Sequence, residues 1–280
     1  MKGGLVILFE ALGALTETGD LDRASWTVLL NGDEEIGSLG SRTTIEEEAR
    51  KADRGFVFES AQDGGAMVSS RRGLGQFHLS VHGVASHAGS AHERGRSAIR
   101  AIAAKILAIE ALTDYERGVT LTVGTVQGGS KRNIVPGFAE AWIDLRYDDA
   151  ETGERMKARL EEIARAEDVP GTHAELWGSL HRPPKLETPE VRRMIEQYDA
   201  IARGLGLDPS PPRHSGGGTD GSLMGAVGLA TLDSVGAAGG RAHTDEEFVD
   251  LASLPARAAN VAILLRRLIR AQLYAPPAGE

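Results

Sequence analysis

The sequence predicts a mixed α/β protein in which a smaller α+β domain interrupts a larger α/β domain. Helical and strand-like patterns of apolar residues alternate along the whole chain. From residue 73 to residue 179 they follow the order strand, helix, strand, strand, helix, strand. On either side of this region the chain is richer in glycine and proline and the patterns are shorter, which indicates a domain inserted between two pieces of another.

The first piece of the larger domain is expected over residues 1–70. Its apolar residues recur with a helical period in two stretches and run together, as in buried strands, in two others. The expected elements are a helix at 4–18, a strand at 25–32, a helix at 43–53 capped by Thr43 or Thr44, a strand at 56–60 that Glu59 closes, and a polar, Gly-rich linker at 62–73.

The inserted domain is expected over residues 71–181. Its strands alternate apolar and polar residues, as strands with one solvated face do. The order β-α-β-β-α-β is the split βαβ, or ferredoxin-like, pattern. The strands are expected at 74–83, 119–129, 138–148 and 172–179, and the helices at 97–112 and 151–167.

The second piece of the larger domain is expected over residues 182–280. Three prolines between residues 181 and 189 interrupt the preceding pattern. A helix at 191–207, Gly-rich short strands within 215–240 and a closing helix at 250–273 are then predicted.

Composition excludes several classes of function. The 280 residues are 41% hydrophobic and 25% charged, which is typical of a soluble globular protein. A net charge of −9 argues against a nucleic-acid partner, and no apolar run reaches the roughly 18 residues that a membrane helix needs. The chain has no cysteine, so His and carboxylate side chains must hold any metal. The amino terminus does not resemble a signal peptide, which predicts a cytoplasmic location.

Three adjacent acids follow the predicted strand at 25–32. Asp33, Glu34 and Glu35 repel one another unless a positive charge lies nearby, so the choice is between a solvated turn and a metal site. At the end of a strand, one carboxylate of such a pair can bind a metal while its neighbour takes a proton from water.

Other candidate residues have equally simple alternative interpretations. Glu59 ends an apolar strand, where it is either an exposed strand-end acid or a ligand. His243 either binds a metal from its loop or merely precedes a capping box formed by Thr244 and Glu247. His87 lies among small residues in a loop and is an exposed histidine unless it has a partner.

The Gly-rich stretch SGGGTDG, residues 215–221, offers backbone N–H groups that suit an oxyanion or a carboxylate, although it is also a common turn before a helix. Arg146 has a simple alternative role as the ion-pair partner of Asp144. The candidate substrate-binding residues are Asn133, Arg146, Arg182, Gly217, Gly218 and Thr219.

Six segments in one order are more specific than any single residue. They are DEEIGSLGSR, FVFESA, GVASHAGSAHERGRSAI, NIVPGFAEAWIDLRYD, SGGGTDGS and GGRAHTDEEFVDLASL. In this order they resemble the zinc-dependent aminoacylase and carboxypeptidase family, which includes acetylornithine deacetylase, succinyl-diaminopimelate desuccinylase and glutamate carboxypeptidases of the carboxypeptidase G type. The resemblance extends from Met1 to the last helix.

The resemblance implies a discontinuous di-metal hydrolase domain with an inserted lid and dimerisation domain. Glu34 matches the general base that deprotonates the attacking water. Glu35 and His243 match ligands of one metal ion, and Glu59 matches a ligand of the other. The implied metals are two zinc ions, with cobalt or manganese as possible substitutes. His87 matches a lid histidine that reaches the partner subunit's active site in a homodimer and helps to hold the tetrahedral intermediate.

The resemblance also implies that Asn133, Arg146 and Arg182 bind substrate, and the arginines suit bidentate recognition of a carboxylate. The family pattern has two further ligands, in a His-x-Asp motif and in an Asp immediately before an MKGG-like segment. Here MKGG begins the chain, which predicts an amino-terminal truncation with little activity, weak metal affinity and poor solubility. Met67 stands roughly where the glutamate carboxypeptidase branch has a lysine, so specificity for glutamate stays open.

The predicted function is metal-dependent hydrolysis of amide or peptide bonds in a small peptide or N-acyl amino acid that bears a carboxylate. The alternative is a non-catalytic fragment that keeps only dimerisation. A third possibility, a carbohydrate site at SGGGTD, is disfavoured because aromatic residues make up only 5% of the chain.

Overall fold

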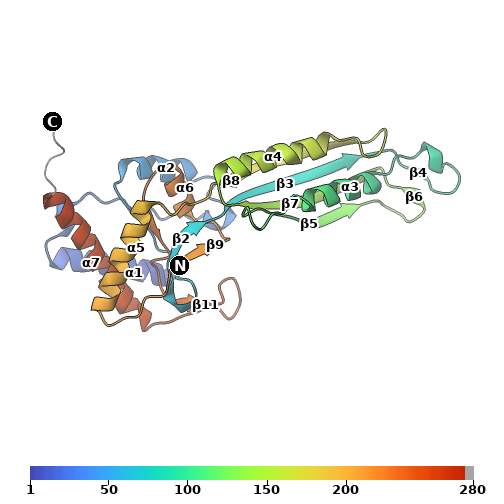
Figure 1. Ribbon diagram of the computed structural model, residues 1–280. Helices are drawn as coiled ribbons and strands as arrows, with labels where there is room; N and C mark the ends of the chain where they lie inside the picture. Colours follow the sequence, from blue (N-terminus) through green and yellow to red (C-terminus); the bar gives the residue numbers. More distant parts are fainter. Residues whose placement is uncertain (275–280) are drawn as a thin grey trace, which may run out of the picture. The chain divides into compact units, whose positions relative to one another are not determined.

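The structure, a computed structural model, describes residues 1–274 and divides into two compact units (Figure 1). Unit 1 comprises Met1–Arg71 and Lys185–Glu280, and unit 2 comprises Arg72–Pro184. Both units combine helices with sheets, so the predicted mixed α/β fold class is confirmed. None of the helices that the structure describes combines the length and apolar composition that spanning a membrane requires.

Unit 1 is built around a small four-stranded sheet. Its strands lie in the order β1 (Gly55–Val57), β10 (Thr231–Asp233), β2 (Val68–Arg71) and β9 (Arg213–Ser215). The outer pairs are parallel and the central pair is antiparallel. Residues from both pieces of the chain therefore alternate across one sheet.

Three helices enclose the main core of unit 1: α1 (Lys2–Glu17), α5 (Pro189–Gly204) and α7 (Ser253–Tyr274). Their apolar residues recur every three or four positions, so each helix buries one stripe. In α1 the buried residues are Gly4, Ile7, Ala11 and Leu15. The remaining elements of unit 1 are η1 (Leu21–Arg23), η2 (Glu34–Ile36), α2 (Arg42–Lys51), η3 (Asp63–Gly65), α6 (Asp220–Ala226), β11 (Gly239–Gly240) and β12 (Phe248–Val249).

Unit 2 has an antiparallel sheet in the order β5 (Thr120–Gly128), β7 (Phe138–Tyr147), β3 (Gly73–His82) and β8 (His173–Arg182). This strand order, with the two intervening helices, is the predicted ferredoxin-like arrangement. Helices α3 (Ala98–Glu110) and α4 (Ala150–Arg165) pack on the apolar residues of the sheet to form the core. The tip of the unit carries η4 (His92–Arg94) and the short paired strands β4 (Ser86–His87) and β6 (Ile134–Val135).

A buried lysine joins the two helices of unit 2. The ammonium group of Lys105 on α3 donates to the carbonyl oxygens of Ile163, Ala164 and Ala166 at 2.7, 3.1 and 2.6 Å, and it pairs with Asp168 at 2.8 Å. These carbonyls lie at the carboxyl end of α4, where a cation is favoured and intrahelical partners are lacking. Lys105 therefore serves as a tertiary cap for α4.

Three expectations about local structure are wrong. Residues 25–32 are not a strand: in the described part of the chain they pair with no other strand, and a strand needs a neighbour for its backbone hydrogen bonds. The predicted linker at 62–73 contains the buried strand β2, whose polar side chains are satisfied inside the unit. No helix follows Thr244 directly, since its hydroxyl accepts from the Glu246 N–H within a turn and α7 begins only at Ser253.

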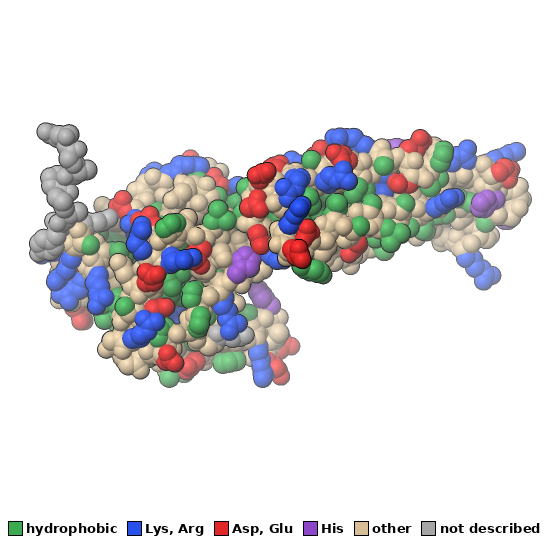
Figure 2. Space-filling view, in the orientation of Figure 1, with side chains coloured by type: hydrophobic (Ala, Val, Ile, Leu, Met, Phe, Trp, Pro, Cys, Tyr) green, Lys and Arg blue, Asp and Glu red, His purple; other side chains and the backbone are tan. Residues whose placement is uncertain are grey.

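The boundaries of two other elements differ from the prediction. Helix α2 begins at Arg42, so the two threonines proposed as caps lie inside it. Strand β1 ends at Val57, which places Glu59 two residues beyond the strand. Figure 2 shows Lys and Arg interspersed with Asp and Glu on the visible face, without a continuous basic stripe there.

Candidate functional site

The three carboxylates of the acidic turn at residues 33–35 have different roles. Asp33 accepts hydrogen bonds from the Gly40 N–H at 2.8 Å and from the Ser41 N–H and hydroxyl at 3.1 and 2.6 Å. The hydrogen bond from the Ser41 side chain, assisted by those from the backbone, lowers the pKa of Asp33. Asp33 therefore closes the turn, and Glu34 and Glu35 lie on η2, which this turn supports.

The same turn is joined to the Gly-rich segment of the second piece. The carboxylate of Asp220 accepts from the Asn31 amide at 2.8 Å and from the Ser38 hydroxyl. Ser38 is fully buried and has a positive φ of 55°, an uncommon backbone conformation for a residue other than glycine. Two segments nearly 190 residues apart in sequence are thus joined beside Glu34 and Glu35.

Glu59 is partly buried. Burial raises the pKa of its carboxyl, and the charges of Asp233 and Glu35 raise it further, while Arg71 lowers it. A meeting of Glu35 and Glu59 at a metal centre stays a prediction.

His243, the third predicted ligand, lies on the segment between β11 and β12. It is exposed, and its positive φ of 64° again marks an uncommon backbone conformation. Within the part of the chain that the structure describes, no group of three or more His, Asp or Glu side chains is arranged to hold a metal ion. The convergence of Glu35, Glu59 and His243 around one pocket, with Glu35 and His243 on one metal ion and Glu59 on the other, stays a prediction.

The Gly-rich loop after β9 is held mainly by its own side chains. Thr219 caps α6: its hydroxyl accepts from the Gly221 N–H at 3.2 Å and donates to Asp233 at 3.0 Å. The Gly217 N–H donates to the Ser215 hydroxyl at 3.2 Å, and the Gly217 carbonyl accepts from Arg71 at 3.0 Å. The Thr219 side chain is thus committed to structure, so a role in binding substrate falls to the backbone of this loop.

Arg71 and Asp233 were not singled out in the sequence. They form a buried ion pair in which Arg71 Nε and Nη2 donate to the two carboxylate oxygens at 2.7 and 3.0 Å. The signal for Asp233 was present: like Glu59, it is a lone acid at the end of an apolar strand, where an unpaired charge is costly. The role of Arg71 could not be identified from the sequence, because its segment has the polar, Gly-rich composition of a linker.

At the tip of unit 2 the structure brings His87 and Asn133 together. His87 pairs with Ile134 across β4 and β6, and the Ala88 N–H donates to the Asn133 carbonyl at 3.0 Å. The Gly89 and Ser90 N–H groups both donate to His87 Nδ1 at 3.1 Å. A ring nitrogen that accepts hydrogen bonds carries no proton, so neutral His87 is the Nε2–H tautomer and offers a donor.

The two predicted substrate arginines lie at the other end of the sheet of unit 2. Arg146 on β7 and Arg182 on β8 both pair with Leu74 on β3, one on each side. Arg146 donates to Asp144 at 2.6 and 3.0 Å, which is the ion pair considered as its simple alternative role. Arg182 is buried, and burial together with the positive charge of Arg182 lowers the pKa of the neighbouring His181. Substrate binding by either arginine stays a prediction.

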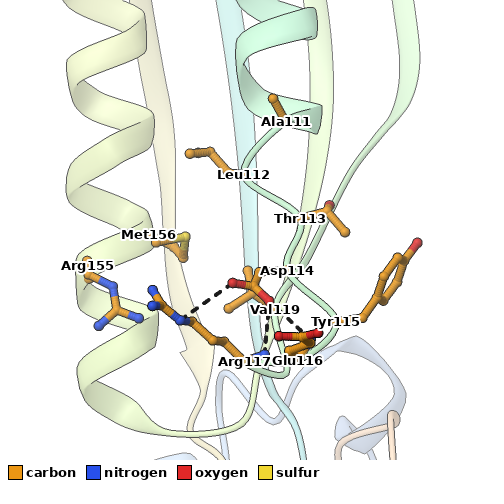
Figure 3. A pocket seen from close by; sticks show the side chains of 10 residues that line it. All are labelled: Ala111, Leu112, Thr113, Asp114, Tyr115, Glu116, Arg117, Val119, Arg155 and Met156. Atoms are coloured by element: carbon orange, nitrogen blue, oxygen red, sulfur yellow. Dashed lines mark hydrogen bonds and ion pairs between the residues drawn. The ribbon is translucent and has the colours of Figure 1, made fainter.

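A surface hollow of about 450 Å³ lies elsewhere in unit 2, lined by α4 and by the loop that joins α3 to β5 (Figure 3). It is lined mainly by residues 111–117 together with Arg155 and Met156. Asp114, one of its charged residues, accepts from the Glu116 and Arg117 N–H groups at 3.1 Å and holds the turn together. None of the predicted site residues lines this hollow.

Comparison with known proteins relates both units to peptidases. Residues 69–172 match the family model of the M20-type peptidase dimerisation domain. Carboxypeptidase G2 of Pseudomonas sp. (strain RS-16) is 30% identical over 258 residues, which are 91% of this chain but 62% of that enzyme. A succinyl-diaminopimelate desuccinylase of Halorhodospira halophila is 27% identical over 96% of this chain and 73% of its own length.

The folds agree as well. The crystal structure of aminopeptidase PepT from Bacillus cereus ATCC 10987 superposes with a TM-score of 0.77 at 26% identity, over 95% of this chain and 70% of that one. A tripeptidase from Staphylococcus aureus superposes with a TM-score of 0.78 at 24% identity and supports the fold alone. This chain spans 62% of the length of carboxypeptidase G2, which is less than two thirds of that enzyme.

Proposed function

This chain contains an M20-type peptidase dimerisation domain and is homologous to carboxypeptidase G2 and succinyl-diaminopimelate desuccinylases, and from that premise we propose that it serves metal-dependent hydrolysis of an amide or peptide bond. The proposed substrate is a small peptide or N-acyl amino acid with a free carboxylate. The observation that carries this proposal is the junction in unit 1, where the turn of Glu34 and Glu35 is tied through Asp220 to the Gly-rich loop.

In this proposal the protein groups divide the work. Glu34 takes a proton from the attacking water as a general base. Glu35 and Glu59 supply carboxylate oxygens and His243 supplies an imidazole nitrogen, which are donor types that zinc accepts. Because no three such side chains form one group in the described residues, we assign no step to the metal and propose only that these residues are its candidate ligands.

His87 would act as a neutral hydrogen-bond donor. With its Nδ1 occupied by two backbone N–H groups, Nε2–H is available to a negatively charged oxygen such as that of a tetrahedral intermediate. This would serve the active site of a partner subunit. Nitrogen-15 NMR of the imidazole tests the tautomer directly, and a protonated Nδ1 in the neutral ring would exclude this role.

Zinc titration calorimetry combined with an assay against N-acyl amino acids tests the hydrolase proposal. Glu35→Gln and Glu59→Gln are expected to weaken zinc binding, because each removes a charged ligand. Glu34→Gln is expected to abolish hydrolysis while zinc still binds. Unchanged zinc affinity in both ligand variants would contradict the assignment.

A second candidate function is dimerisation without catalysis. It is favoured by the match of residues 69–172 to a dimerisation domain and by the missing three-ligand group in the described part of unit 1. Zinc binding and hydrolysis by the 280-residue chain would exclude it. Dimer formation without either activity would support it.

We place the proposed homodimer contact at the β5 edge of unit 2. Strand β5 ends the sheet, and an exposed edge offers unpaired backbone groups to another strand. Apolar side chains are exposed on and beside it: Val126 is 56% exposed, and Ile99 and Leu107 on α3 are 44% and 74% exposed. Ile99 and Leu107 are eight residues apart and lie on one side of the helix.

Light scattering after size-exclusion chromatography tests this contact. The double variant Leu107→Lys, Val126→Lys is expected to convert a dimer to a monomer, because burying two added charges is costly. Leu251→Lys is the matched control, since Leu251 is 70% exposed in unit 1. Equal dimer content in both variants would refute the placement at β5.

A further inference from the structure

The buried ion pair of Arg71 and Asp233 uses every donor of the guanidinium group. Arg71 Nε donates to Asp233 at 2.7 Å, and Nη2 donates to Asp233 at 3.0 Å and to the Ser234 hydroxyl at 3.1 Å. Nη1 donates to the Gly217 carbonyl at 3.0 Å and to the Ser215 hydroxyl at 3.3 Å. An arginine has five N–H donors, so Arg71 has none left for a substrate.

Asp233 is satisfied in the same way. It accepts from Arg71 twice, from the Thr219 hydroxyl at 3.0 Å and from the Ser234 hydroxyl at 3.3 Å. The arginine is 4% exposed and the aspartate is fully buried. A buried ion pair offers little net stability compared with apolar residues, because desolvation offsets the attraction. Its geometry is therefore a better guide to its role than its energy.

That geometry sets the orientation of one peptide group. In a planar trans peptide the C=O and the following N–H point in opposite directions. Arg71 Nη1 holds the Gly217 carbonyl toward the buried pair, so the Gly218 N–H of the same peptide points away from it. Thr219, the next residue, is anchored to Asp233, so the chain is held on both sides of this N–H.

We propose that Arg71 and Asp233 are positioning residues that hold the Gly217–Gly218 peptide so that the Gly218 N–H donates to the carboxylate of the substrate. This rests on the proposed function, because it takes a carboxylate-bearing substrate as given. Neither side chain touches the substrate. A lysine at position 71 keeps the charge but lacks the planar set of donors, so it cannot hold carboxylate, carbonyl and hydroxyl groups together.

Asp20 is a matched control in the same unit. It is 1% exposed and accepts from Arg266 Nε at 2.7 Å and from Arg270 at 3.4 Å. This cluster joins the region after α1 to α7, and among the described residues none of its hydrogen bonds reaches the Gly-rich loop. Asp20→Asn thus perturbs a buried carboxylate in unit 1 without touching residues 215–219.

The test is a titration of the nitrogen-15-labelled chain with succinate, monitored by NMR at the Gly218 amide. In the wild type and in Asp20→Asn, the Gly218 signal is expected to shift with succinate. In Arg71→Lys and Asp233→Asn, the affinity for succinate is expected to fall about tenfold, as for loss of one hydrogen bond to a charged group. Arg71→Lys keeps the proposal testable if Asp233→Asn does not fold.

The outcomes separate this proposal from the proposed hydrolase function. A Gly218 signal that does not respond in the wild type, or an equal loss of affinity in Asp20→Asn, overturns the positioning role. A response that Arg71→Lys weakens, in a protein that hydrolyses nothing, supports the positioning role while the hydrolase function fails. In an active form, the KM for a free-acid substrate should rise in Arg71→Lys while that for its methyl ester is unchanged, and an equal rise for both overturns the proposal.

Discussion

Lys185 should make the stability of unit 1 depend on pH in the alkaline range. The residue is 1% exposed, and its ammonium group donates to the Ser69 and Val68 carbonyls at 2.9 and 3.4 Å. Burial lowers the pKa of Lys185 from 10.5 to about 8, the Arg71 charge adds to the fall, and the Asp233 and Glu187 charges oppose it. The folded state therefore releases this proton more readily than the unfolded state does.

This difference in pKa sets the sign and the size of the effect of pH on the free energy of unfolding. Below pH 8 Lys185 is protonated in both the folded and the unfolded state, so the free-energy cost of burying its charge is fully present. One unit of pKa corresponds to roughly 1.4 kcal/mol, so the full cost is roughly 3 kcal/mol. As the pH rises from about 8 toward 10.5 the cost is relieved, and about 2 kcal/mol of it should be regained between pH 7 and pH 9.5.

The variant Lys185→Met isolates this contribution because it cannot titrate. Urea unfolding of the wild type and the variant at pH 7 and pH 9.5 gives the free energy of unfolding of each. Between pH 7 and pH 9.5, the free energy of unfolding of the wild type should rise by about 2 kcal/mol relative to that of Lys185→Met. The exposed Lys131→Met serves as the control and should show no such shift. A difference for Lys185→Met that is equal at both pH values would refute the reasoning.

Four further substitutions should change the free energy of unfolding or the melting temperature. Lys105→Met removes the tertiary cap of α4 and leaves its last carbonyls unpaired, so urea unfolding should show a loss of about 3 kcal/mol. Thr188→Ala removes the side-chain N-cap of α5 and should cost about 1 kcal/mol in the same measurement. Gly4→Ala would place the new Cβ against the Phe58 carbonyl oxygen and should lower the free energy of unfolding by up to ~3 kcal/mol. In the same helix, the new Cβ of Gly13→Ala meets no atom within contact distance, so this variant should have a slightly higher melting temperature.

The sequence alone predicts most of unit 2 and, in unit 1, the helices α1, α2, α5 and α7. In unit 2, long alternating strands and periodic helices carry their burial pattern in the order of their residues, and the ferredoxin-like order follows from it. The junction of the Glu34–Glu35 turn with the Gly-rich loop was not among these predictions. Periodicity cannot reveal contacts between segments nearly 190 residues apart.

Only the tertiary structure determines the roles of individual charged residues. Strand β2 was not predicted because its segment has a composition typical of a linker. Arg71 can be buried there only because it forms an ion pair with Asp233, which comes from the other piece of the chain. The three acids at 33–35 look alike in sequence, and only the fold commits Asp33 to its own turn. The apolar run at 25–32 has the composition of a strand but pairs with no strand in the described residues. In each case the physical reason is the same: local sequence sets the propensity of a segment, whereas burial of a charge or pairing of a strand depends on a distant partner.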